Sequence, residues 1–282
     1  MKPEALQQLY DEAYAEQYNA RFITHQNHGG KTAAEREVLG KAFDRIGPSA
    51  RWLDLACGTG YFLAQFPNIN RTGLDLSPGM LGYARKNNPD VPLVQGDFRN
   101  RDLFAPGSFD VISSMWWAYS YLETFSEIEQ FVSNVSYWLA DDGIFFLPIG
   151  DYTILAQTWS PVPQELPYHL NPNLQIGGGI RITGLTWSYD DVGGKRHENM
   201  LFPQPPEMVA MMRRHFPSAF EFMYTQYYRA VLASKSDLDP SFVADIVARY
   251  HTAVVADKRS KSSAPKGLRG VKRLVSRVLG LR

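Results

Sequence analysis

The 282-residue chain has few of the features that crosslink, anchor or export a protein. Cys57 is its only cysteine, so an intrachain disulfide is impossible and we expect a reducing compartment. No apolar run reaches the roughly 18 residues that a membrane-spanning helix needs, and the first residues lack the apolar centre of an export signal. These absences predict a cytoplasmic protein.

Net charge is also absent, because 29 Lys and Arg residues balance 29 Asp and Glu residues. The two signs are unevenly spread. Residues 258–282 hold nine basic residues and no acidic one, which leaves 20 basic against 29 acidic residues in the rest of the chain. Nucleic-acid binding draws its affinity from clustered cations, so a body with a net charge of −9 argues against a nucleic-acid partner.

Short apolar runs that end in polar residues or glycine alternate with helix-like segments in the first half of the chain. This alternation, with two more strands expected within 220–235, predicts an α/β fold with a doubly wound, mostly parallel, seven-stranded sheet. The capping-box spacing of Thr32 and Glu35 predicts a helix that starts there and runs to Ile46. The expected strands are 52–56, 72–76, 92–94, 109–113 and 144–149, and the clearest helices are 77–86 and 123–139.

The alternation of short apolar runs with helix-like segments ends after Ile149. Residues 151–203 are rich in Pro, Gly, Tyr and Trp, and short alternating pieces such as 181–187 predict antiparallel strands. We expect a strand-rich insertion after the fifth strand of the sheet. Helices are expected again at 206–215 and from Asp237 to about His251.

The stretch "LDLACGTGYF" (53–62) places two glycines where a buried strand ends. A single glycine there needs no ligand, since it can serve the turn or the helix packing alone. A dinucleotide-binding turn would need a third glycine where Leu63 stands, so a nicotinamide cofactor is disfavoured. Gly30-Lys31-Thr32 matches the end of a phosphate-binding loop, but no strand leads into it.

Acidic residues close the next strands. Asp75 stands where a carboxylate would meet the two hydroxyls of a ribose. Asp97 can accept from an exocyclic amine, and the adjacent Phe98 can cover a purine face. Asp54, just before the glycines, can face a cation. Each acid alone can be a helix cap or a loop residue, but as an ordered set they predict a site for a cationic, adenosine-like ligand.

The motifs "LDLACGTGYF", "GLDLS", "QGDF" and "FDVISSM", in this order and spacing, resemble the class I (Rossmann-like) S-adenosylmethionine-dependent methyltransferases of the small-molecule type. The resemblance covers about residues 50–150 and implies S-adenosylmethionine as the cofactor. It implies Asp75 at the ribose and Met115 beside the sulfonium. The implied cofactor contacts are Tyr14, Tyr18, Asp54, Ala56, Gly58, Gly60, Asp75, Leu76, Asp97, Phe98 and Met115.

Tyr14 and Tyr18 enter that set because "YDEAYAEQY" resembles the N-terminal helix that folds over the cofactor in this family, although Tyr10 can take the role instead. The chain then divides into five segments. They are 1–48, an N-terminal helical lid; 49–150, the cofactor-binding core; 151–203, a substrate cap; 204–257, the C-terminal part of the core; and 258–282, a basic amphipathic tail.

The methyl acceptor is harder to predict, because a sulfonium already carries a good leaving group and the protein needs few special residues. Enzymes that methylate exocyclic amino groups of bases typically carry [DNS]-P-P-[FYW] where this chain has Ser114-Met115-Trp116-Trp117. Methylation at carbon 5 of a pyrimidine uses a cysteine nucleophile, but Cys57 lies in the cofactor loop. Both kinds of base methylation are therefore disfavoured, and the resemblance implies a small-molecule acceptor.

Trp116, Trp117, Tyr119 and Tyr121 lie beside the expected transfer point, and such aromatic residues suit a sugar or ring substrate as well as plain packing. His169, His197 and Asp151 are possible bases, of which the two histidines are the preferred candidates, and no metal ligands are assigned. The likeness is strongest to enzymes that act on amino sugars or sugar hydroxyls, although those carry Lys-Asp-Tyr where this chain has Lys31-Thr32-Ala33.

The sequence thus predicts a methyltransferase that acts on a hydroxyl or amine of a small molecule, possibly a sugar or glycan precursor. The alternative is a non-catalytic protein that binds S-adenosylmethionine as a scaffold or sensor. In the tail, residues 266–282 place apolar and basic side chains on opposite sides of a helix, which is typical of peripheral membrane contact but also of a solvated or partner-docked helix.

Overall fold

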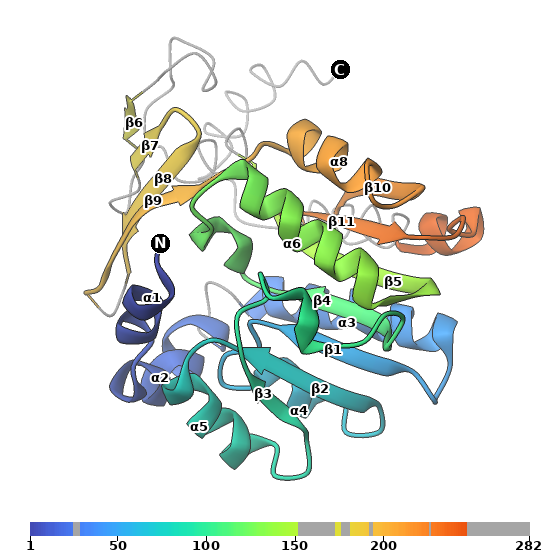
Figure 1. Ribbon diagram of the computed structural model, residues 1–282, viewed down its shortest axis with the longest axis horizontal. Coiled ribbons are helices and arrows are strands. Elements are labelled where there is room, and N and C mark those ends of the chain that lie inside the picture. Colours follow the sequence, from blue (N-terminus) through green and yellow to red (C-terminus); the bar gives the residue numbers. More distant parts are fainter. Residues whose placement is uncertain (25–28, 152–172, 176–180, 192–193, 226, 247–282) are drawn as a thin grey trace, which may run out of the picture.

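The computed structural model describes residues 1–24, 29–151, 173–175, 181–191, 194–225 and 227–246. A seven-stranded sheet in the order β10-β11-β5-β4-β1-β2-β3 forms its centre (Figure 1). Strands β1 to β5 pair in parallel, and β11 runs antiparallel to both of its neighbours. The strands are β1 (Arg51–Leu55), β2 (Asn70–Asp75), β3 (Leu93–Gln95), β4 (Phe109–Ser114), β5 (Leu139–Ile149), β10 (Ser218–Met223) and β11 (Arg229–Ser234).

Helices cover both faces of this sheet, as the predicted α/β fold requires. The helices are α1 (Pro3–Leu9), α2 (Glu12–Tyr18), α3 (Gly29–Ile46), α4 (Tyr61–Gln65), α5 (Pro78–Asn87), α6 (Phe125–Trp138) and α8 (Pro205–Arg213), with a π-helix η1 (Asn19–Ile23) and 3₁₀ turns η2 (Arg101–Leu103) and η3 (Ala118–Tyr121). One buried cluster joins α6 and α8 to one face, and a second joins α3, α4 and α5 to the other.

Helix α6 shows how the sequence produces this layering. Its N-cap Thr124 accepts a hydrogen bond from the backbone N–H of Glu127 at 3.1 Å, which satisfies one of the free donors at the start of the helix. Phe131, Val135 and Trp138 recur at helical spacing and are fully buried against the sheet. Each such side chain contributes about 1.5–3 kcal/mol through burial.

The predicted strands of the first half are confirmed with small shifts, and β5 is longer than expected because Leu139 already pairs with Phe109. The predicted capping box is wrong. Helix α3 begins at Gly29, the Thr32 hydroxyl donates to the Ile23 carbonyl oxygen, and Glu35 forms a buried ion pair within the helix. The spacing of Thr32 and Glu35 therefore has another cause than helix initiation.

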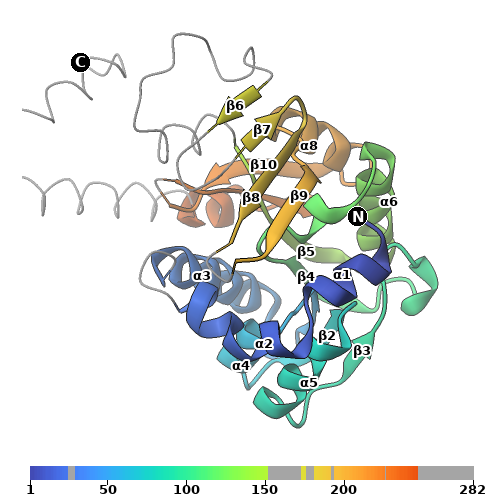
Figure 2. The ribbon, with the colours of Figure 1, turned by 90° about the vertical axis from the view of Figure 1, so that its left-hand side faces the viewer.

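The insertion after β5 forms a separate antiparallel sheet in the order β6-β7-β8-β9. Its strands are β6 (Asn173–Gln175), β7 (Arg181–Thr183), β8 (Thr186–Asp190) and β9 (Arg196–Leu201). Figure 2 shows β8 and β9 above the N-terminal helices α1 and α2. The Nζ of Lys195, just before β9, donates to the Leu9 carbonyl oxygen at 2.5 Å and to Asp11 at 3.0 Å, so the insertion is tied to the N-terminal segment.

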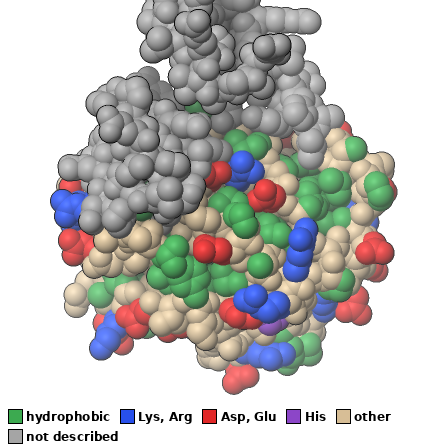
Figure 3. Space-filling view, turned by 90° about the horizontal axis from the view of Figure 1, so that it is seen from above, with side chains coloured by type: hydrophobic (Ala, Val, Ile, Leu, Met, Phe, Trp, Pro, Cys, Tyr) green, Lys and Arg blue, Asp and Glu red, His purple; other side chains and the backbone are tan. Residues whose placement is uncertain are grey.

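Surface charge on the part of the molecule that the structure describes is mixed. Figure 3 shows basic and acidic side chains interspersed on one face, without a broad basic surface among the atoms that are not grey. No helix in the described ranges has both the length and the apolar character that a bilayer crossing demands. The predicted tail, 258–282, lies outside the described residues.

Candidate active site

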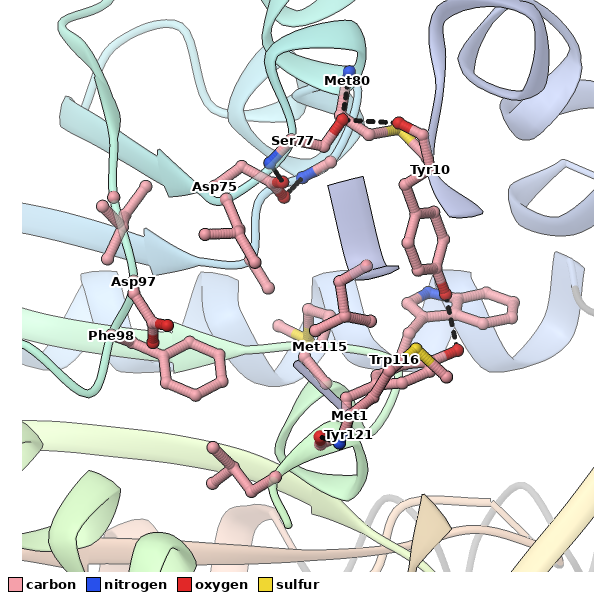
Figure 4. A pocket seen from close by; sticks show the side chains of 18 of the residues that line it. Met1, Tyr10, Asp75, Ser77, Met80, Asp97, Phe98, Met115, Trp116 and Tyr121 are labelled. Carbon is pink, nitrogen blue, oxygen red and sulfur yellow. Dashed lines mark hydrogen bonds between the residues drawn. The ribbon is translucent and has the colours of Figure 1, made fainter. Parts of the chain in front are cut away.

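A cavity opens at the carboxyl ends of β1, β2, β3 and β4 (Figure 4). Connections from β1 and β4 leave in opposite directions along the sheet, and such a switch point leaves a crevice where α/β proteins bind ligands. The cavity brings together many residues that the sequence singled out: Tyr18, Ala56, Gly58, Asp75, Leu76, Asp97, Phe98, Met115, Trp116 and Tyr121.

The turn between β1 and α4 forms one wall of the cavity. Ala56, Gly58 and Gly60 all have positive φ angles of 53°, 56° and 70°, a conformation that favours glycine. Gly58 lines the cavity, and a Cβ built on it meets nothing within 4 Å, so any side chain there would occupy ligand space. This open cradle fits a ligand that lies directly on the backbone.

Gly60 has a different role from the one expected. It does not line the cavity but caps the start of α4, where a Cβ would lie 2.4 Å from the Nδ2 atom of Asn88. That amide donates to the Gly60 carbonyl oxygen at 2.9 Å. The second glycine of the motif therefore permits α4 to pack against α5.

Asp75, at the end of β2, is held by two backbone donors. The N–H of Gly58 donates to Oδ2 and the N–H of Ser77 donates to Oδ1, each at 2.8 Å. Burial raises the pKa of this carboxyl, and backbone hydrogen bonds from Ser77, Gly58 and Leu76 act in the opposite direction. Because a carboxylate oxygen can accept two hydrogen bonds, each oxygen keeps capacity for one ribose hydroxyl.

Asp54 lies beneath the site and does not line it, unlike the direct contact that was expected. Its side chain is buried with 1% exposure, and Oδ1 accepts from the Ser113 hydroxyl at 2.7 Å, which in turn accepts from the Trp52 indole N–H at 2.9 Å. Burial raises the pKa of Asp54 to about 7, and the nearby charges of Asp75 and Glu35 act in the same direction. A cation above it would draw Asp54 back toward its ionised form.

Asp97 and Phe98 both line the cavity after β3. The Phe98 ring packs against Phe131 with centroids 4.8 Å apart, so its position is fixed by the core. The Asp97 carboxylate accepts four hydrogen bonds from the backbone N–H and guanidinium of Arg99, another lining residue, at 2.5–3.0 Å. An adenine amine would therefore share Asp97 with Arg99, and the role expected for Asp97 stays a prediction.

The N-terminal helices close the cavity from the other side. Tyr10 and Tyr18 line it, and the Ser77 hydroxyl donates to the Tyr10 carbonyl oxygen at 2.5 Å, which fixes the segment over the end of β2. Tyr14 does not line the cavity, because its hydroxyl donates to Asp191 of the insertion at 2.5 Å. As the N-terminal residue that contacts the cofactor, Tyr10 therefore fits the geometry better than Tyr14 does.

The segment after β4 supplies aromatic side chains to the cavity. Trp116 and Trp117 have positive φ angles of 56° and 59°, an uncommon backbone conformation for bulky residues that tends to occur at functional sites. Trp116 and Tyr121 line the cavity, and the Lys31 Nζ lies 3.7 Å from the Trp116 ring centroid. The Lys31 ammonium also pairs with Glu35 at 2.7 Å.

Two of the predicted acceptor contacts point elsewhere. Trp117 packs against Trp187 and Phe202 of the insertion, with ring centroids 5.5 and 6.0 Å apart. Tyr119 is fully buried, and its hydroxyl oxygen accepts from the Gly150 N–H at 3.2 Å. Both side chains join the insertion or β5 to the core, because burial of large rings there stabilises the fold.

Of the two candidate bases, His169 lies outside the described residues. His197, on β9, is fully buried and does not line the cavity. Its Nδ1 lies 2.7 Å from the Tyr121 hydroxyl and its Nε2 lies 2.9 Å from Asp191. Tyr121 therefore stands between this imidazole and the cavity. Within the described residues no group of three or more His, Cys, Asp or Glu side chains is placed to hold a metal ion.

Several lining residues escaped the sequence analysis. Ser77 had a detectable signal, since it precedes Pro78 as the N-cap of α5 and accepts from the Met80 N–H at 3.0 Å. Arg99 had no detectable signal in the sequence, because nothing in the local pattern shows that its side chain contacts Asp97. The other lining residues missed carry no polar side chain and are indistinguishable in sequence from core or loop positions: Met1, Leu6, Leu74, Met80, Gly96, Ala118 and Leu122.

Comparisons with known proteins agree with this geometry. Residues 53–147 match the family model described as a methyltransferase domain. The chain is 33% identical over 139 residues to a dTDP-4-amino-2,3,4,6-tetradeoxy-D-glucose N,N-dimethyltransferase of Saccharopolyspora spinosa, over 48% of this chain and 54% of that protein. It is 25% identical over 228 residues to a dTDP-3-amino-3,6-dideoxy-alpha-D-glucopyranose N,N-dimethyltransferase of Streptomyces fradiae, over 80% of this chain and 84% of that protein.

The chain thus spans about half the length of the Saccharopolyspora relative. Among solved structures, the crystal structure of DesVI of Streptomyces venezuelae is similar with a TM-score of 0.57 and 21% identity, over 79% of this chain and 98% of that chain. At that identity the likeness shows the fold. Together with the glycine cradle and Asp75, these matches show that residues 53–147 are similar to the methyltransferase domain of S-adenosylmethionine-dependent enzymes with a Rossmann-like fold.

Proposed function

We propose that this protein transfers a methyl group from S-adenosylmethionine to an amino or hydroxyl group of a small molecule, and that an amino sugar is the favoured acceptor. The observation that carries the proposal is the pairing of the open backbone at Gly58 with the buried carboxylate of Asp75 at one edge of the cavity. These groups fit the methionine and ribose portions of the cofactor.

The class of acceptor is supported by the relatives. Two similar proteins are N,N-dimethyltransferases of dTDP-linked amino sugars, one of which aligns over 84% of its own length. The cavity offers Trp116 and Tyr121 on the side away from Asp97, where an aromatic face and a hydroxyl suit a sugar ring (Figure 4). We further propose that the insertion, 151–203, covers the bound acceptor.

Two measurements test the proposal. Calorimetric titration with S-adenosylmethionine and S-adenosylhomocysteine should show binding of both. Transfer from methyl-labelled S-adenosylmethionine is then assayed with dTDP-linked sugars that carry either an amine or a hydroxyl at carbon 3 or carbon 4. Labelled amino sugar is the expected product. Tight cofactor binding without transfer to any sugar would instead favour the scaffold or sensor alternative, and no cofactor binding would refute both.

The location in the cytoplasm and the membrane contact of residues 266–282 also stay proposals. The apolar and basic sides expected of that segment would bind anionic vesicles. Deletion of residues 266–282 should abolish co-sedimentation with such vesicles and leave cofactor binding unchanged. Unaltered co-sedimentation would count against a membrane role for the tail.

A further inference from the structure

A continuous chain of hydrogen bonds leads from the cavity into the insertion. The hydroxyls of Tyr10 and Tyr121, two residues that line the cavity, lie 2.6 Å apart. The Tyr121 hydroxyl lies 2.7 Å from Nδ1 of His197, and Nε2 of His197 lies 2.9 Å from Oδ2 of Asp191. Figure 4 shows the two hydroxyls meeting on the side of the cavity opposite Asp97 and Phe98. Four side chains from three parts of the chain thus form one line.

The chemistry of the groups fixes the direction of every hydrogen bond in this line. A carboxylate only accepts, so Nε2 of His197 carries the proton that is donated to Asp191. Nδ1 of the neutral ring is then an acceptor, and the Tyr121 hydroxyl must donate to it. Because the Tyr121 hydroxyl donates its proton to His197, its oxygen accepts the hydrogen bond from the Tyr10 hydroxyl. The oxygen of Tyr10 is left as an acceptor beside the cavity.

The surroundings of His197 keep it ready to take a proton. Burial lowers its pKa below the ordinary value of 6.5, although the hydrogen bond and charge of Asp191 act in the opposite direction, so the ring is neutral at pH 7. Against the effect of burial, hydrogen bonds from Tyr14 and His197 hold the pKa of Asp191 below its usual range. Asp191 is therefore an ionised partner for an imidazolium.

The other titratable groups around the imidazole come from each element that packs on it. Tyr189 of β8 stacks on the ring, with centroids 4.5 Å apart and planes within 7°. From the turn before β9, Lys195 disfavours the protonated ring and Asp190 at the end of β8 favours it. Burial raises the pKa of both Tyr10 and Tyr121 well above 10, so neither is a phenolate that could compete as the base.

We propose that Tyr10, Tyr121, His197 and Asp191 form a proton relay that carries the acceptor's proton from the cavity into the insertion. The inference rests on the proposed function, and it names His197 and Asp191 as residues that act through the two tyrosines. When bound, S-adenosylmethionine supplies the methyl group as part of a sulfonium and leaves as neutral S-adenosylhomocysteine.

The proton balance is complete within these residues. As the O–H bond of a hydroxyl acceptor breaks, its electron pair forms the bond to the methyl carbon, and the carbon–sulfur bond breaks with its electrons on sulfur. The released proton goes to the Tyr10 oxygen, the Tyr10 proton to Tyr121, and the Tyr121 proton to Nδ1 of His197. For an amine that arrives as an ammonium ion, the same relay removes the N–H proton before the nitrogen attacks.

This assignment makes the insertion part of the reacting site and not only a cover. Tyr10 lies between α1 and α2, Tyr121 belongs to η3 after β4, and His197 belongs to β9. The relay is complete only when the insertion is docked on the N-terminal segment, and two contacts hold that docking. The first is Lys195, which donates to both Leu9 and Asp11, and the second is the hydrogen bond from Tyr14 to Asp191.

The test compares Tyr121→Phe and Tyr10→Phe with Tyr119→Phe in the full-length protein. Each substitution removes one hydroxyl and keeps the ring. Tyr119 lies in the same 3₁₀ turn as Tyr121, but its hydroxyl contacts only the Gly150 N–H among the described residues and takes no part in the relay. The readout is the pH dependence of kcat for methyl transfer to a dTDP-linked amino sugar, at saturating S-adenosylmethionine, from pH 5 to 9.

For the wild type we expect kcat to rise to a plateau with an apparent pKa below 6.5, set by His197. Tyr121→Phe and Tyr10→Phe should lower kcat at pH 7 by about 10²- to 10⁴-fold, the usual contribution of general-base catalysis. In both variants the plateau should be replaced by a rate that keeps rising with pH. Tyr119→Phe should keep the wild-type profile. Identical profiles in Tyr121→Phe and Tyr119→Phe would overturn the relay.

A second measurement needs no acceptor and so separates failure of the relay from failure of the proposed function. Nitrogen-15 NMR of the histidine rings in the wild type and in Tyr121→Phe reports which ring nitrogen of His197 carries the proton. We expect the Nε2–H tautomer in the wild type, and a downfield shift of Nδ1 when Tyr121 no longer donates to it. An Nδ1–H tautomer would overturn the proposed direction of transfer, even if cofactor binding and methyl transfer are normal.

Discussion

Replacement of Asp75 by alanine tests the cofactor site most directly. The carboxylate is 9% exposed, so water screens it little, and each of its oxygens keeps capacity for one ribose hydroxyl. A hydrogen bond to a charged group contributes about 1.5–3 kcal/mol. Loss of two such bonds should weaken binding of S-adenosylmethionine by about 10²- to 10⁴-fold, since 1.4 kcal/mol corresponds to a factor of ten.

The same substitution also acts on the folded protein without ligand. It leaves the N–H groups of Gly58 and Ser77 without their acceptor, and each unsatisfied buried donor costs about 1–3 kcal/mol unless water replaces the carboxylate. Asp75→Asn is therefore a useful second variant, because its single carbonyl oxygen still accepts from one of the two. We expect its affinity to lie between those of the wild type and Asp75→Ala.

The assay is calorimetric titration with S-adenosylmethionine and S-adenosylhomocysteine, combined with thermal unfolding of each variant. Asp110→Ala is the matched control, because Asp110 also accepts from a backbone N–H and a side chain, both of Arg51, but at the amino end of β4. It should change stability and leave the affinity unaltered. The reasoning about Asp75 is refuted if folded Asp75→Ala binds S-adenosylmethionine as tightly as Asp110→Ala does.

Three further predictions follow from the cavity. Gly58→Ala should abolish cofactor binding in calorimetry with a stability loss of only about 1 kcal/mol, whereas Gly60→Ala, whose Cβ clashes with a neighbouring amide, should lower the free energy of unfolding by about 1–3 kcal/mol. Asp54 has a pKa raised from 3.8 to about 7, so the stability it contributes is present below pH 4 and lost as the pH rises through 7. Urea unfolding should therefore show the wild type losing up to about 4 kcal/mol relative to Asp54→Asn between pH 4 and 8, and a pH-independent difference would contradict this. Asp97→Ala should weaken cofactor binding by less than tenfold, because Arg99 already occupies its oxygens, and a larger loss would show that the cofactor displaces Arg99.

Local sequence signals predicted the parts of the site that follow directly from one strand and the turn after it. Asp75 and Gly58 are examples, since a carboxylate at a strand end and a glycine with positive φ are requirements of the adjacent backbone. The same local reasoning failed for Thr32 and Glu35. Their capping-box spacing was real, but Glu35 serves a buried ion pair with Lys31, and the helix had already started at Gly29.

The tyrosines show where periodicity stops being informative. Tyr10, Tyr14 and Tyr18 are spaced by four residues, a spacing that would put them on one side of a continuous helix. The helix is interrupted between α1 and α2 near Tyr10. The Tyr14 hydroxyl donates a hydrogen bond to Asp191 of the insertion. A contact between residues 177 positions apart in the chain therefore helps to decide which tyrosines face the cavity.

The sequence by itself predicted the mostly parallel sheet and the positions of Asp75 and Gly58 at the cavity, because strand periodicity and strand-end chemistry depend on neighbouring residues. Only the tertiary structure decided which aromatic side chains face the cavity and joined His197 to Tyr121, 76 positions apart. Such a line of hydrogen bonds depends on how the insertion packs on the N-terminal helices. Packing of distant segments is set by the burial of whole surfaces, and no local pattern of residues encodes it.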